Sequence, residues 1–127
     1  MDILGIGVDL VEVARIERAM ARHEGFVPRI FSVRERKRCE DCASPARRYA
    51  ACFAAKEAAS KALGTGVKGF TWQEVEVLSD ERGRPYLVLS GRAEEVAKSR
   101  GVEKMQVSIS HTRDLAMAFA QAVGGGA

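Results

Sequence analysis

The sequence predicts an α+β domain built on a mainly antiparallel sheet, with one long helix packed against it. Two stretches, 3–10 and 105–111, alternate in residue character with the period of a strand. Between them, 45–63 is rich in helix-forming residues, with Pro45 at its first position and glycines beyond its end. Because 115–123 can return beside 105–111 after a short turn, the sheet is expected to be antiparallel.

The first strand is expected to have two different faces. One face carries Leu4, Ile6, Val8 and Leu10, and the other carries Ile3, Gly5, Gly7 and Asp9. The glycines on the second face let another segment approach the strand backbone closely. A helix is expected from Val13 to about His23, with Val13, Ile16 and Met20 facing inward.

Capping and turn signals predict the remaining elements. Ser32 and Glu35 have the spacing of a capping box, which opens a short polar helix. The stretches 72–78 and 85–89 predict a hairpin. Another helix is expected after Ser90. Ser44 is the expected cap of the long helix, which Gly64 and Gly66 terminate.

Length and composition indicate one globular domain. The 127 residues are expected to form a single domain over 1–123 and a flexible tail over 124–127. No apolar run approaches the roughly 20 residues that cross a bilayer, and the N-terminus has no signal-peptide pattern, so we expect a cytoplasmic protein without a membrane partner. The odd number of cysteines, Cys39, Cys42 and Cys52, predicts free thiols rather than a disulfide framework or a structural zinc site.

Positive charge is concentrated in one part of the chain. The net charge is +3, but the segment 15–48 carries ten Lys or Arg and five Asp or Glu, so that the rest of the chain is slightly acidic. Such a patch indicates an acidic partner or phosphate groups, or else a solvated helix face.

Two carboxylates, Asp9 and Glu57, stand among apolar or small residues. Taken singly, Glu57 can form an i,i+4 ion pair with Lys61, and Asp9 can cap the helix that follows it. Taken together, they can hold a Mg²⁺ ion that takes further oxygen ligands from water and from a phosphate-bearing substrate. Lys61 and the glycines of "GTG" could reach that substrate, although "GTG" is equally consistent with a helix end. His111 is either a structural turn residue or part of the site.

Three motifs resemble those of the holo-[acyl-carrier-protein] synthases, the short form of the 4'-phosphopantetheinyl transferases. They are "GIGVDLVEVARIE" at 5–17, "FAAKEAASKALGTG" at 53–66 and "VSISHTRDLAMA" at 107–118, in the order and at the spacing of that family. The resemblance implies transfer of 4'-phosphopantetheine from coenzyme A to a serine of an apo acyl carrier protein, with release of adenosine 3',5'-bisphosphate. It also implies a homotrimer with active sites between subunits.

The resemblance implies a role for each matching residue. Asp9 and Glu57 would bind Mg²⁺ with the coenzyme A diphosphate, and Lys61 would neutralise charge that develops during transfer. The other implied coenzyme A contacts are Gly64, Thr65, Gly66 and His111. The acidic carrier protein would dock on Arg15, Arg18, Arg22 and Arg29. The base that removes the serine proton stays open among a metal-bound water, Glu57 and Lys61.

One position departs from the family pattern. Cys52 stands where the family often has an arginine, so that Arg47 or Arg48, one turn earlier, compensates or coenzyme A binding is weaker.

Two other functions compete with the transferase. A non-enzymatic binder of acidic proteins or RNA would use the segment 15–48, although no aromatic residues interleave with its basic ones as in RNA-stacking modules, so we expect no nucleic-acid partner. A different Mg²⁺-dependent phosphotransferase would use a nucleoside triphosphate.

Overall fold

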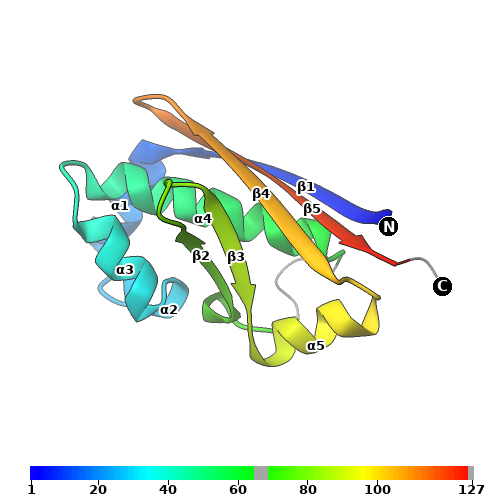
Figure 1. Cartoon of the computed structure of the whole chain (residues 1–127). Helices are drawn as coiled ribbons and strands as arrows, with labels where there is room; N and C mark the ends of the chain where they lie inside the picture. The colour runs from blue at the N-terminus through cyan, green and yellow to red at the C-terminus, as the bar shows by residue number, and fades with distance from the viewer. Residues whose placement is uncertain (65–68, 126–127) are drawn as a thin grey trace.

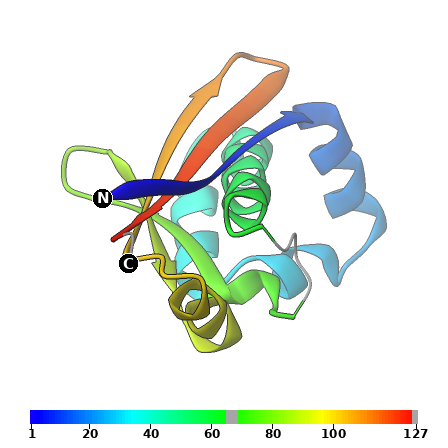
Figure 2. The same cartoon turned by 90° about the vertical axis from the view of Figure 1, so that its right-hand side faces the viewer.

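The long helix α4 (Pro45–Ala62) lies under a twisted antiparallel sheet (Figure 1) in a computed structural model that describes residues 1–64 and 69–125. The other elements, in chain order, are β1 (Asp2–Glu12), α1 (Val13–Arg22), α2 (Phe26–Ile30), α3 (Val33–Glu40), the 3₁₀-helix η1 (Trp72–Glu74), β2 (Val75–Ser79), β3 (Pro85–Leu89), α5 (Gly91–Ser99), β4 (Lys104–His111) and β5 (Leu115–Gly124). Viewed along α4, α1 lies on one side of the helix and the β2–β3 hairpin on the other (Figure 2). The predicted α+β class is confirmed. Within the described ranges, no helix is long and apolar enough to span a membrane.

The strands form two antiparallel sheets. The larger sheet has the order β1-β5-β4, so that the two chain-terminal strands pair with each other and β5 is central. Asp9 of β1 pairs with Ala118 of β5, which in turn pairs with Ile109 of β4. The β2–β3 hairpin forms the second sheet by itself. The strands β1 and β4 are therefore the two edges of the sheet that covers α4.

Small residues let α4 approach the sheet closely. A Cβ atom on Gly5 would lie 2.0 Å from the carbonyl oxygen of Ala62, and one on Gly7 would lie 2.1 Å from that of Ala58. On β5, the inward side chains are the fully buried alanines 116, 118, 120 and 122. The segment that approaches the glycine-bearing face of β1 is thus the second half of α4. This contact fixes the position of Asp9, which lies on the same face of the strand.

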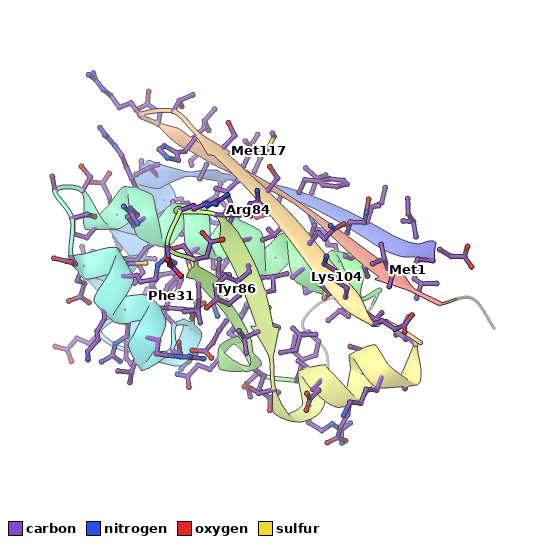
Figure 3. The ribbon with its side chains drawn as sticks, viewed as in Figure 1. Met1, Phe31, Arg84, Tyr86, Lys104 and Met117 are labelled. Carbon is purple, nitrogen blue, oxygen red and sulfur yellow. The ribbon has the colours of Figure 1, made fainter. Side chains whose placement is uncertain are left out.

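The opposite face of the sheet is apolar and exposed. Val8 pairs with Phe119 and Leu10 pairs with Met117, and all four side chains are exposed by 40% or more. Figure 3 shows Met117 on the side of the sheet that faces away from α4. Ile6 and Leu115 extend the same surface. A sheet face of this composition is typical of an interface rather than of a surface that stays in water.

Aromatic residues hold the first half of α4 against the end of α2 and against η1. Tyr49 and Phe53 lie one turn apart on α4. The ring of Tyr49 packs at 4.7 Å from that of Phe31, and the ring of Phe53 packs at 5.3 Å from that of Trp72. Tyr49, Phe53, Glu57 and Lys61 form one stripe along α4. The stripe is buried at Tyr49 and Phe53, half-buried at Glu57 and exposed at Lys61.

Several elements differ from the sequence-based expectation. Residues 72–74 form a 3₁₀-helix instead of the start of a strand, because the Thr71 and Glu74 capping box turns the chain and the Lys56 amine binds the Trp72 carbonyl. Ser44 and Ser90 precede helices, but neither side chain makes a capping hydrogen bond. The capping box of Ser32 and Glu35 is confirmed. The strand β5 includes Gly124, the first residue of the predicted tail, because it pairs with Asp2.

Candidate active site

Asp9 and Glu57 come together where β1 crosses the second half of α4. Asp9 has only 18% of its side chain exposed, and Glu57 is half-buried. Burial raises the pKa of Glu57, and the negative charge of Asp9 raises it further, whereas Lys61 and Arg15 lower it. The two carboxylates therefore repel each other in a partly desolvated place. Such a pair gains free energy from any cation that lies between its members.

Lys61 connects the helix to the strand at this pair. Its Nζ atom donates a hydrogen bond to the carbonyl oxygen of Val8 at 2.9 Å and lies 3.4 Å from Oδ1 of Asp9. Half of the Lys61 side chain is exposed, so the amine is accessible to a ligand. The predicted catalytic residues Asp9, Glu57 and Lys61 are thus neighbours, although 52 residues separate Asp9 from Lys61 in sequence.

The donor set suits Mg²⁺. Among the residues that the structure describes, no group of three or more His, Cys, Asp or Glu side chains could hold a metal ion. Two carboxylates without a nitrogen or sulfur ligand match a small hard cation that keeps several waters and takes further oxygens from a substrate. Burial first, and then the charge of Asp9, raise the pKa of Glu57, and a cation between the two carboxylates would offset both effects.

A cavity of about 350 Å³ begins at Lys61 and continues to Gly64, along the first residues of β1. Gly64 has a φ of 83°, a left-handed conformation that ends α4 and favours glycine. Of the three predicted "GTG" contacts, Gly64 therefore borders the cavity next to the carboxylate pair. Thr65 and Gly66 lie outside the described residues.

His111, Arg47 and Arg48 form a separate group. They line a cavity of about 230 Å³ together with Ala51, Cys42 and neighbouring residues. His111 is at the end of β4, whereas Asp9 is on β1, at the opposite edge of the sheet. The predicted site residues therefore lie in two separate groups in the single chain. We call Asp9, Glu57, Lys61 and Gly64 the carboxylate half-site, and Arg47, Arg48 and His111 the arginine half-site.

Cys52 is part of the core beside the arginine half-site. The residue is 4% exposed, and its thiol donates a hydrogen bond to a carboxylate oxygen of Glu35 at 3.3 Å. The pKa of the Cys52 thiol lies well above its usual range. The largest cause is a hydrogen bond with the neighbouring Cys39 thiol, and burial is the second. A small cavity of about 50 Å³ lies between Cys52 and Arg48, and Arg38 also lines it. Of the two arginines expected to compensate, Arg48 is the one that borders both this cavity and the His111 cavity.

Sequence reasoning missed the buried ion pair of Glu35 and Lys56. Both side chains are fully buried, and their charged groups lie 2.8 Å apart. Lys56 also donates to the carbonyls of Trp72 and Val75, and Glu35 accepts from the backbone N–H of Val77. The pair links α3, α4 and the start of β2 behind the carboxylate half-site. The only sequence signal was a lysine among alanines that otherwise face the core.

The predicted carrier-docking arginines form an exposed stripe. Arg15, Arg18 and Arg22 follow one another along the outer face of α1, and Arg29 is exposed on α2. Arg15 also lowers the pKa of Glu57, which places the start of this stripe near the carboxylate half-site. A cavity of about 560 Å³ between the starts of α1 and α4 contains none of Asp9, Glu57 or Lys61.

Residues 5–120 match the family model of the 4'-phosphopantetheinyl transferase superfamily. The chain is 49% identical over 117 residues to the holo-[acyl-carrier-protein] synthase of Clavibacter michiganensis, with 92% of each chain covered. It is 48% identical over 123 residues to that of Desulforudis audaxviator, with 96% of this chain and 94% of the relative covered.

Solved structures of holo-[acyl-carrier-protein] synthases also match the chain over nearly its whole length. The crystal structure of the Neisseria meningitidis holo-[acyl-carrier-protein] synthase matches with a TM-score of 0.88 at 30% identity, covering 96% of this chain and 99% of that one. The Helicobacter pylori enzyme in complex with coenzyme A matches with a TM-score of 0.82 at 31% identity, covering 93% and 99%. The chain belongs to the holo-[acyl-carrier-protein] synthase family of the 4'-phosphopantetheinyl transferase superfamily.

Proposed function

We propose that this protein transfers the 4'-phosphopantetheine group of coenzyme A to a serine hydroxyl of an apo acyl carrier protein in the cytoplasm, with Mg²⁺ as cofactor. The observation that carries the proposal is the carboxylate half-site, where Asp9, Glu57 and Lys61 meet although they come from two distant motifs. Membership of the holo-[acyl-carrier-protein] synthase family supports the same reaction, and the free thiols of the three cysteines suit the cytoplasm.

The reaction exchanges one phosphorus–oxygen bond for another. The serine oxygen of the carrier protein forms a bond to the phosphorus that carries pantetheine, and the bond from that phosphorus to the bridging oxygen of the diphosphate breaks. Adenosine 3',5'-bisphosphate leaves with the bridging oxygen, and the serine proton is released. The nucleophile and the leaving group both belong to the substrates, so the protein contributes positioning and charge neutralisation.

The carboxylate half-site would perform this work at the diphosphate. Mg²⁺ held by Asp9 and Glu57 would neutralise the diphosphate oxygens as charge develops on them. Lys61, whose amine is fixed by the Val8 carbonyl, would donate to an oxygen of the leaving group. Gly64 would let the substrate approach the backbone at the end of α4. Because the amine of Lys61 already contacts the Val8 carbonyl and the Asp9 carboxylate, we regard Lys61 as a charge-neutralising group.

We further propose a homotrimer in which each active site joins the carboxylate half-site of one subunit to the arginine half-site of the next. Two observations support it. The exposed face of β1 and β5 bears Val8, Leu10, Met117 and Phe119, which need a partner surface. The two half-sites also lie at opposite edges of the sheet, so that a head-to-tail contact between copies would bring complementary halves together.

The arginine stripe would receive the carrier protein. Arg15, Arg18, Arg22 and Arg29 present positive charge next to the carboxylate half-site, which matches the acidic surface around the serine that is modified. Docking on α1 would deliver that serine to the diphosphate without a rearrangement of the fold.

The intact mass of an apo acyl carrier protein tests the proposed function. The carrier protein is incubated with this enzyme and coenzyme A, in Mg²⁺ or in EDTA, beside a carrier variant whose serine is replaced by alanine. A mass gain of one phosphopantetheine group is expected only for the serine-containing carrier in Mg²⁺. A mass gain in EDTA would show that transfer does not need Mg²⁺. No mass gain with a folded enzyme and a competent carrier would contradict the proposed function.

A further inference from the structure

The cavity that begins at Lys61 has a second cationic wall. Its lining comprises Leu4, Gly5, Ile6, Lys61, Ala62, Leu63, Gly64, Arg100 and Val102. Apart from Lys61 and Arg100, these residues are uncharged, and none of the described residues that line the cavity is a carboxylate. A space of about 350 Å³ between two cations suits an anionic group of a small molecule.

The end of α5 directs Arg100 toward this cavity. The backbone N–H of Arg100 donates to the carbonyls of Val96 and Ala97, and Gly101, with a φ of 76°, ends the helix at the next residue. The guanidinium then lies against Gly64, with Nη1 only 2.8 Å from the place that a Cβ on Gly64 would occupy. The left-handed backbone of Gly64 favours glycine, and the absence of a side chain there leaves room for the Arg100 guanidinium.

The charge of Arg100 is not neutralised within the chain described by the structure. The ion pairs there are Arg34–Glu76, Lys56–Glu35 and Lys61–Asp9, none of which includes Arg100. Arg100 is exposed, yet its guanidinium lies beside Gly64 at the end of α4 instead of extending into solvent. A guanidinium that borders a cavity and has no carboxylate partner among the described residues is well suited to bind phosphate.

We propose that Arg100 is a second phosphate-binding residue of the coenzyme A site, acting across the cavity from Lys61. The inference rests on the proposed function, because it takes coenzyme A as the ligand that reaches Lys61. Coenzyme A offers two phosphate sources, its diphosphate and its 3'-phosphate, and the guanidinium can bind oxygens of either in the same way.

A purely structural role gives different expectations. The last carbonyls of α4 carry partial negative charge, so Arg100 beside Gly64 would also stabilise the end of that helix. In that case, loss of the guanidinium would lower the melting temperature and leave coenzyme A affinity unchanged. Phosphate binding instead predicts lower affinity in a protein that melts at nearly the same temperature.

The test compares Arg100→Gln and Arg100→Lys with the native protein by calorimetric titration of coenzyme A and of dephospho-coenzyme A, which lacks the 3'-phosphate. Arg92→Gln is the matched control, because Arg92 is an exposed arginine at the other end of α5 and does not line the cavity. Loss of one charge-assisted hydrogen-bonding group predicts about tenfold weaker binding for Arg100→Gln, partial recovery for Arg100→Lys and no change for Arg92→Gln.

The two ligands identify the phosphate. A similar loss for both ligands assigns Arg100 to the diphosphate, and a loss confined to coenzyme A assigns it to the 3'-phosphate. Equal affinity of the native protein and Arg100→Gln for both ligands would overturn this inference while leaving the proposed function intact. Failure of the folded native protein to bind coenzyme A would overturn both.

Discussion

Lys61 and Val8 are joined by a hydrogen bond of 2.9 Å from the lysine amine to the strand carbonyl. This bond holds the amine beside Asp9, on the face of β1 that Gly5 and Gly7 open to α4. The glycines, the lysine and the two carboxylates therefore belong to one arrangement, in which close packing of a helix on a strand places charges that would otherwise lie far from each other.

Glu57→Gln is expected to abolish transfer and to raise the melting temperature of the metal-free protein at neutral pH. Because folding raises the pKa of Glu57, its ionised form costs stability, and this cost appears as the pH rises through the folded pKa. The gain should disappear below about pH 4, where a glutamate is protonated in both states. Mg²⁺ should stabilise the native protein more than the variant. Thermal melts from pH 4 to 8 measure this, and a lower melting temperature for the variant at pH 7 would indicate a structural role.

Gly7→Ala is expected to destabilise the fold by about 1–3 kcal/mol or more, because the new methyl group would overlap the Ala58 carbonyl oxygen and displace α4. Activity should fall with stability, since the same helix carries Glu57 and Lys61. Gly25→Ala is the matched control, because no atom lies within 4 Å of the added methyl group. Chemical denaturation measures both changes, and equal stability of the two variants would contradict the close helix–strand contact.

Lys56→Met should destabilise the protein by about 3–5 kcal/mol, because it leaves the Glu35 carboxylate buried without its cation. The exposed pair of Arg34 and Glu76 provides the comparison, and Arg34→Met should destabilise the protein far less, because solvent screens an exposed ion pair. Replacing both buried partners, as in Lys56→Met with Glu35→Leu, should recover part of the loss. Urea denaturation of the three variants decides the point. A small effect of Lys56→Met alone would show that the buried pair contributes little.

Arg18→Glu is expected to raise the KM for the carrier protein at least several-fold, because it places a negative charge in the stripe that faces an acidic partner. The KM for coenzyme A should not change. Arg18 is preferred to Arg15 for this test, since Arg15 also acts on the pKa of Glu57. Arg92→Glu serves as a control for net charge. If Arg18→Glu and Arg92→Glu had the same effect, docking would not depend on α1.

The fold was largely predictable from the sequence, because periodicity and capping residues define its elements. The alternation of β1 showed two faces but could not show that the glycine face packs on α4, while Val8 and Leu10 stay exposed in the single chain. The 3₁₀-helix at 72–74 depends on the Lys56 amine, which comes from a distant element. The separation of His111 from Asp9 depends on the strand order, which linear spacing does not determine.

Subunit complementation tests directly whether the two half-sites act together from different subunits. Glu57→Gln removes the carboxylate half-site, and Arg48→Gln with His111→Ala removes the arginine half-site. Both inactive proteins are co-expressed with different tags, purified through both tags and assayed for carrier modification. In a head-to-tail trimer that contains both variants, only one of the three sites joins two intact half-sites, so about a third of the native activity is expected. Mixed oligomers no more active than the two parents would contradict the shared site.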